Sequence, residues 1–364
     1  MLKLLLIRKD WFIVFMKITD NQNIQTKFLV SRSLFLGGGV SLILGLGEKD
    51  AWIGVIIGFL IGIGILYLYT KLSTSIQGTL HNYLIKKTPL NLLLRFLLLL
   101  YYLFLIFLLF LVFGTFIYSY YLPFTKTIVS CAPFLFLAIF LGNKGTQAIA
   151  RMAQILFWVG MSLIIIKTFA TAPYVRFENF LPIYTISKTN IFLTALNFAV
   201  LTTAPYILLL EEKTSFKNNL KSYTLTFLTL FIMLNYIVGS FGSNLVKTFS
   251  YPEFTILRLI NFFNFIQNIE SFLALSWIFD IFIAISLASK KIKDICHYKK
   301  GWITYIILFI LLFIVGNFVI SDYRITISIY QSFTFVFLLF IIFIFALLGI
   351  KKGLTKSTEK CKSL

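Results

Sequence analysis

Residues that carry chemistry are scarce in this chain of 364 residues. It has three cysteines and two histidines, and none of them has the spacing of metal ligands or of a redox pair. It also contains no glycine-rich phosphate loop, no HExxH sequence and no serine, histidine and aspartate set. The sequence therefore predicts no enzyme, no metal site and no cofactor. It predicts inert thiols at Cys131, Cys296 and Cys361.

Charged residues are few as well. They make up 13% of the chain, whereas hydrophobic residues make up 59%. Soluble domains carry about 25% charged residues. A soluble fold could not bury so many Phe, Leu and Ile side chains, so lipid must be the solvent for most of the chain.

Acidic residues are especially rare, at 13 against 33 lysines and arginines. In a soluble protein this excess would indicate a nucleic-acid partner. Here the basic residues lie in short loops between apolar runs, which is typical of membrane topology. We therefore expect a lipid bilayer, and no nucleic acid, as the partner of these charges.

Long apolar runs predict ten membrane-spanning helices, because a span needs about 20 mostly apolar residues. The predicted spans are 28–46, 51–70, 92–121, 127–141, 150–170, 191–210, 223–241, 271–289, 302–320 and 327–350. The predicted fold is an all-α transmembrane domain over residues 28–350. An N-terminal segment, 1–27, precedes it and a basic tail, 351–364, follows it. Residues 1–15 are either an upstream extension of the start site, with Met16 as the natural start, or a helix at the membrane surface.

Most lysines and arginines fall on one side of the membrane if the N-terminus is cytoplasmic. This count assigns Arg32 to the cytoplasmic N-terminal segment and places both termini in the cytoplasm. Residues 48–50 then lie at the outer end of the first span, where we expect Glu48, Lys49 and Asp50 to be solvated. Residues 211–212, two glutamates, end the sixth span at the cytoplasmic face.

Two spans contain residues that interrupt helices. The first contains residues 37–39, three consecutive glycines, each costing about 1 kcal/mol relative to alanine within a helix. In the sixth, Pro205 removes a backbone donor and clashes with the previous turn. Interruptions in corresponding halves predict an inverted repeat with a ligand site near the membrane midplane. Ordinary helix packing is the alternative interpretation.

Asp280 lies midway along the eighth span and is the only acidic residue that we place deep in the membrane. An acid there costs at least a few kcal/mol, so it marks a proton or cation site or the partner of a buried polar group. At the end of the third span, Tyr118 belongs to a cluster typical of an aromatic belt. The candidate ligand-binding residues are Gly37, Gly38, Gly39, Tyr118, Thr202, Thr203, Pro205, Tyr206, Ser276 and Asp280.

Five segments resemble, in order, those of the spore germination protein B-subunit family. They read LGLGEKDAW (44–52), NKGTQAIARMAQILF (143–157), NFLPIY (179–184), YPEFTILRLI (251–260) and ESFLALSW (270–277). The resemblance covers the chain from about Met16 to Ile350.

The resemblance implies the amino acid–polyamine–organocation superfamily, with a five-plus-five inverted repeat and broken helices 1 and 6. It further implies a receptor subunit in the inner membrane of a bacterial endospore. Such a subunit binds a small nutrient, typically an amino acid, sugar or nucleoside, and signals germination with an A subunit and a C-subunit lipoprotein. A proton- or sodium-coupled amino acid transporter is the alternative. A self-contained ion pore is disfavoured, because no ring-like cluster of polar residues is present.

Overall fold

The computed structural model describes residues 18–75, 89–123, 125, 127–210, 214–259, 269–296, 328–332 and 334–343, with the single residues 310 and 346. Within these ranges the chain forms helices and no strand. Several predictions lie outside the described residues. They are the nature of residues 1–15, the start at Met16, the two glutamates at 211–212, nearly all of the ninth span and the tail 351–364.

The long helices reproduce most of the predicted spans. They are α2 (Asp20–Ser33), α3 (Val40–Gly47), α4 (Ala51–Ser75), α6 (Pro89–Tyr120), α7 (Thr127–Lys144), α8 (Thr146–Thr171), α9 (Lys188–Thr203), α10 (Phe216–Val246) and α12 (Ile269–Cys296). Short helical segments complete the described part: η1 (Phe35–Gly39), η2 (Glu48–Asp50), η3 (Ala172–Tyr174), η4 (Phe177–Phe180), η5 (Ala204–Leu209), α11 (Pro252–Thr255) and η6 (Ile256–Leu259).

Among the residues that the structure describes, six helical stretches are long and apolar enough to cross a membrane. They are Phe35–Thr74, Pro89–Tyr120, Thr146–Tyr174, Lys188–Leu209, Phe216–Gly242 and Glu270–Cys296. Shorter apolar helices cover Val129–Lys144 and Ser328–Phe343. The chain is therefore an all-α, multi-pass membrane protein.

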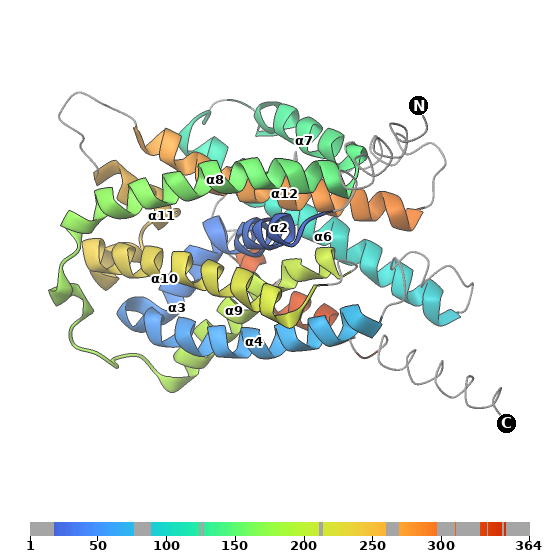
Figure 1. Ribbon diagram of the computed structural model, residues 1–364. Helices are drawn as coiled ribbons and strands as arrows, with labels where there is room; N and C mark the ends of the chain where they lie inside the picture. Colours follow the sequence, from blue (N-terminus) through green and yellow to red (C-terminus); the bar gives the residue numbers. More distant parts are fainter. Residues whose placement is uncertain are drawn as a thin grey trace, which may run out of the picture.

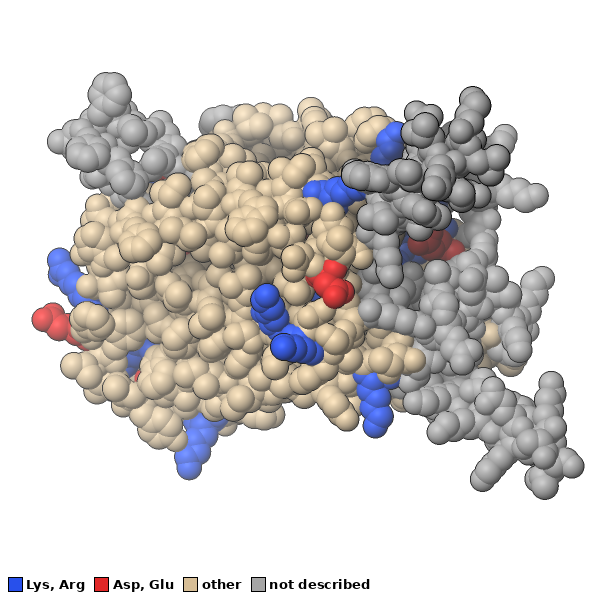
Figure 2. Space-filling model, in the orientation of Figure 1, with Lys and Arg blue, Asp and Glu red and all other residues tan. Residues whose placement is uncertain are grey.

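The long helices lie side by side, and α2 runs through the middle of the bundle (Figure 1). It packs against α8, α10 and α12, while α4 packs mainly on α9. The outer surface is apolar: Leu60, Trp158 and Phe169 are 62%, 64% and 75% exposed. Figure 2 shows one face of the molecule, with few charged side chains on it. Because so much apolar surface cannot face water, these side chains are the ones that contact lipid.

The first helix starts eight residues before the predicted span. Thr19 caps α2, with its hydroxyl accepting from the Gln22 backbone N–H and the Gln22 side chain accepting from the Thr19 N–H. Polar residues of α2 are buried in the bundle, including Lys27, whose Nζ donates to Asn219 Oδ1 at 2.7 Å. Hydropathy could not detect these eight residues of helix, because polar side chains such as Gln22 and Lys27 find partners on other helices.

Asp50 is buried, so the prediction that it is solvated is wrong. Its carboxylate accepts from the backbone N–H groups of Tyr184 at 2.9 Å and Thr185 at 2.7 Å, and from the Thr185 hydroxyl. These contacts join two of the five family-like segments, 44–52 and 179–184, at the turn between α3 and α4. Burial raises the pKa of the Asp50 carboxyl, but the hydrogen bonds outweigh it, so the pKa lies below its ordinary value.

Replacing Asp50 by alanine should lower the free energy of unfolding by about 2 kcal/mol at neutral pH, because buried N–H groups lose their acceptor. A depressed pKa means that this contribution is complete above the ordinary carboxyl pKa and is lost as pH falls through the folded-state pKa. Unfolding in detergent should therefore show that the wild type is more stable than the variant at pH 7, and that this difference in the free energy of unfolding decreases as the pH falls below the ordinary carboxyl pKa. Glu48→Gln is the matched control. The exposed Glu48–Lys247 ion pair should contribute less than about 1 kcal/mol. Equal losses in both variants would contradict the assignment.

Candidate functional site

The predicted break in the first helix is present at the three glycines. Leu36 has an extended backbone (ψ 141°) and Gly37 has φ +88°, so α2 and α3 are separate half-helices. A Cβ at Gly37 would clash with Val112 of α6, and one at Gly38 would lie 3.0 Å from the Tyr330 ring. At Gly39 it would lie 3.0 Å from Leu201 of α9. The glycines thus provide both an unusual backbone conformation and close packing against three neighbouring segments.

Protein side chains satisfy both ends of this break. The Tyr330 hydroxyl donates to the Leu34 carbonyl at 2.9 Å. At the other end, the Gly37 backbone N–H donates to Glu253 Oε1 at 2.9 Å. Arg32 lies in the last turn of α2, where a cation interacts favourably with the helix dipole, and Glu253 faces the start of the second half-helix, where an anion does.

Four ionisable side chains, which we call the charge cluster, meet beside the break: Arg32, Lys167, Glu253 and Asp280. Arg32 Nε lies 3.3 Å from Asp280 Oδ2, and both side chains are buried. Lys167 Nζ donates to Ser276 Oγ at 2.9 Å and interacts electrostatically with the other three members. The cluster thus joins α2, α8, α11 and α12.

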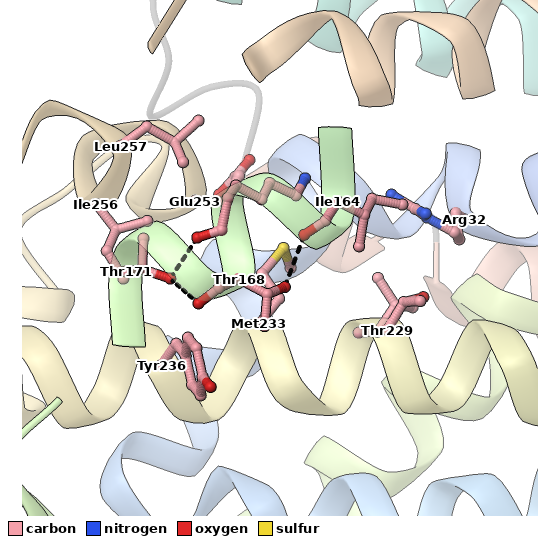
Figure 3. Close-up of a pocket in the computed structure, with 12 residues that line it drawn as sticks. Arg32, Ile164, Thr168, Thr171, Thr229, Met233, Tyr236, Glu253, Ile256 and Leu257 are labelled. Carbon is pink, nitrogen blue, oxygen red and sulfur yellow. Dashed lines mark hydrogen bonds between the residues drawn. The ribbon is translucent and has the colours of Figure 1, made fainter. Parts of the chain in front are cut away.

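A small cavity of about 30 Å³ borders the cluster. Figure 3 shows Glu253 and Arg32 toward opposite sides of the group of residues around it. The lining residues are Arg32, Ile164, Lys167, Thr168, Thr171, Thr229, Leu230, Met233, Tyr236, Glu253, Ile256 and Leu257. A cavity of this volume holds about two water molecules. A larger ligand therefore requires α8, α10 or the 252–259 segment to move apart.

None of the ten predicted ligand-binding residues lines this cavity, but three contact residues that do. The Gly37 backbone N–H donates to Glu253, and Ser276 Oγ accepts from Lys167. Asp280 forms an ion pair with Arg32. Tyr118 is 36% exposed near the end of α6 and does not join them.

The residues predicted in the sixth span are buried next to each other at the junction of α9 and η5. Thr202 Oγ1 lies 3.0 Å from the Tyr223 hydroxyl, and Thr203 donates to the Ala199 carbonyl. Pro205 and Tyr206 lie in η5. The helix passes from α to 3-10 geometry here, so the interruption is milder than the unwound segment of the first helix. Proline fits because it occupies the first turn of η5, where its missing N–H costs little.

Two sequence-based statements about the charge cluster are wrong. Asp280 is not the only deeply placed acid, because Glu253 is 7% exposed and reaches Gly37. Arg32, which the charge count placed in the N-terminal segment, is not part of a solvated segment, because it is 2% exposed and paired with Asp280 inside the bundle. Lys167 was missed although a lysine inside an apolar run was a visible signal. For Glu253, the sequence held no signal beyond its place in the family-like segment 251–260.

The region that matches known proteins in sequence includes all residues of this site. The sequence model described as "Spore germination protein" matches residues 23–322, a range that contains every member of the charge cluster. A relative in Bacillus subtilis (strain 168), named "Putative spore germination protein YfkT", is 26% identical over 170 residues. That alignment covers 46% of this chain and 47% of the relative, so the chain spans about half the length of the curated relative that it matches.

Proposed function

Because the chain belongs to the spore germination protein family, we propose that it is the membrane subunit of a nutrient germinant receptor in the inner membrane of an endospore. A small nutrient binds at the break in the first helix, near the membrane midplane. Binding then signals germination through partner subunits of the A and C types.

The charge cluster is the observation that carries this proposal. Desolvating an ionised side chain costs several kcal/mol, and hydrophobic pairs of similar volume stabilise a core at least as well. Four buried ionisable side chains around a broken helix would therefore stabilise the fold less well than apolar side chains of similar volume. A cavity between them, lined by both cations and an anion, supports a ligand-binding role.

The lining favours an amino acid or a similar compound. Arg32 and Lys167 offer positive charge, while Glu253 offers negative charge. A zwitterion meets both signs without adding net charge to the bundle. Ile164, Leu230, Met233, Ile256 and Leu257 leave an apolar surface for a small side chain.

The proposal includes a ten-helix arrangement with a five-plus-five inverted repeat. Its support is the pairing of a broken first helix with a sixth span that changes geometry at Pro205. In this arrangement the nutrient is held on the cavity side of the first helix, and the packed junction with α9 and η5 supports the break from the other side. Both termini face the cytoplasm.

The proposal is tested in spores that lack this protein. A panel of amino acids, sugars and nucleosides should include at least one nutrient whose germination response falls at least tenfold in the deletion strain. The response should return when the gene is restored. Identical responses to every nutrient with and without the protein would refute the receptor function.

A coupled amino acid transporter is the second candidate, and the buried acids and lysine favour it because coupling needs groups whose proton or cation binding changes between states. Purified protein in liposomes separates the two functions. We expect binding of the nutrient without accumulation driven by a proton or sodium gradient. Gradient-driven accumulation would establish the transporter instead.

A further inference from the structure

Glu253 differs from the other members of the charge cluster in its pairing. Arg32 and Asp280 pair with each other, and Lys167 donates to Ser276. No described lysine or arginine lies within ion-pair distance of Glu253. Its Oε1 accepts from the Gly37 N–H, whereas Oε2 is buried and has no hydrogen-bond partner within the described part of the chain. An unsatisfied buried carboxylate oxygen is costly unless a partner arrives.

Contacts on two sides fix the position of the Glu253 carboxylate. Glu253 lies on α11, two residues after Tyr251, whose hydroxyl is 2.6 Å from Thr115 Oγ1 and whose ring packs against Phe116. The Gly37 N–H fixes the carboxylate itself. Its position is therefore determined by α6 on one side and by the helix break on the other.

Glu253 is also the one acid among the described residues that line the cavity. Arg32 lines the cavity too, and its Nη1 has no hydrogen-bond partner among the described residues. Two residues that line the cavity thus carry buried polar atoms without a hydrogen-bond partner among the described residues, a carboxylate oxygen of Glu253 and a guanidinium nitrogen of Arg32.

We propose that Glu253 determines specificity by accepting a hydrogen bond on Oε2 from a protonated amino group of the nutrient, while Oε1 stays on the Gly37 N–H. The carboxylate of the nutrient then faces Arg32 and Lys167. Nutrients without an amino group leave Oε2 unpaired and are rejected, since sites built around a buried polar group discriminate strongly against ligands that fail to pair with it. This inference rests on the proposed receptor function.

The test uses Glu253→Gln in intact spores. The amide oxygen of glutamine can still accept from the Gly37 N–H, so the variant removes mainly the charge that would hold the amino group. L-Alanine and L-valine serve as probes, with propionate and isovalerate as matched compounds that lack the amino group. Losing a buried charge-paired hydrogen bond should raise the half-maximal concentration for an amino acid by about 30-fold or more. Wild-type spores should not respond to propionate or isovalerate.

Glu48→Gln is the matched control, because Glu48 is a partly exposed acid whose partner is Lys247 and which does not line the cavity. It should leave the half-maximal concentration within about twofold of the wild type, in line with the small energies of exposed ion pairs. The amount of protein changes the maximal rate, whereas the half-maximal concentration reports binding. If Glu253→Gln fails to accumulate, Glu253→Asp replaces it. Its shorter side chain cannot reach both the Gly37 N–H and the ligand, so a shift of several-fold is still expected.

The outcomes separate the two proposals. An unchanged half-maximal concentration in a Glu253 variant that accumulates would overturn the role of Glu253 and leave the receptor function standing. A wild-type response only to nutrients without an amino group would do the same. Germination that is indifferent to deletion of the whole protein would instead refute the receptor function.

Discussion

Asp280→Asn is expected to lower the free energy of unfolding by about 3–5 kcal/mol, because it leaves the buried Arg32 guanidinium without its counter-charge. The Arg32 Nε–Asp280 Oδ2 distance is 3.3 Å, and the two side chains are 2% and 0% exposed. Neither carboxylate oxygen has a hydrogen-bond partner among the described residues, so charge is the main interaction lost. Titration of sodium dodecyl sulfate into mixed micelles measures the change.

The double variant Arg32→Met, Asp280→Leu is the decisive comparison. Replacing both members of a buried pair with apolar side chains is often neutral or stabilising, so this protein should unfold within about 1 kcal/mol of the wild type or later. A double variant as unstable as Asp280→Asn would show that packing, and not the unpaired cation, causes the loss. A loss below about 1 kcal/mol in Asp280→Asn itself would contradict the ion pair.

This pairing changes how Asp280 can be used to study transport. Asp280→Asn removes a possible coupling group and destabilises the bundle at the same time. Loss of uptake in that variant alone would therefore not identify Asp280 as a coupling residue. The accumulation assay on wild-type protein remains the clean distinction between sensing and transport.

Gly37→Ala is expected to destabilise the protein by about 3 kcal/mol, for two separate reasons. The first is the backbone: at φ +88° and ψ −114°, an L side chain is strained. The second is space, because the new Cβ would collide with Val112 Cγ1. The same detergent titration measures the loss.

Gly45→Ala is the matched control, since Gly45 lies in regular helix α3 and a Cβ there would meet nothing within 4 Å. It should be neutral or stabilising by up to about 1 kcal/mol, the usual helix preference for alanine. Adding Val112→Ala to Gly37→Ala should recover the steric part of the loss, so the double variant is less destabilised than the sum of the two single variants. Strict additivity would contradict the collision.

The helical fold, most of the spans and the break at Gly37 could all be predicted from the sequence. These features depend on local properties: the apolar length needed to cross lipid and the conformational freedom of consecutive glycines. Helix α2 began earlier than predicted, since its polar residues are buried against another helix and so look like loop residues in one dimension. Asp50 was misjudged for the same reason, because its hydrogen-bond donors come from residues 184–185.

The charge cluster was decided by the tertiary structure. A single buried charge is unfavourable wherever it occurs, and only its partner makes it tolerable. The sequence around Arg32 does not predict that Asp280 is its partner, and the sequence around Gly37 does not predict a contact with Glu253. Each pair forms because the bundle brings α12 or α11 next to the broken first helix. The sequence by itself therefore determined a membrane bundle with a break in its first helix. Which charges meet at that break, and where a cavity opens beside them, followed from packing between helices that are distant along the chain.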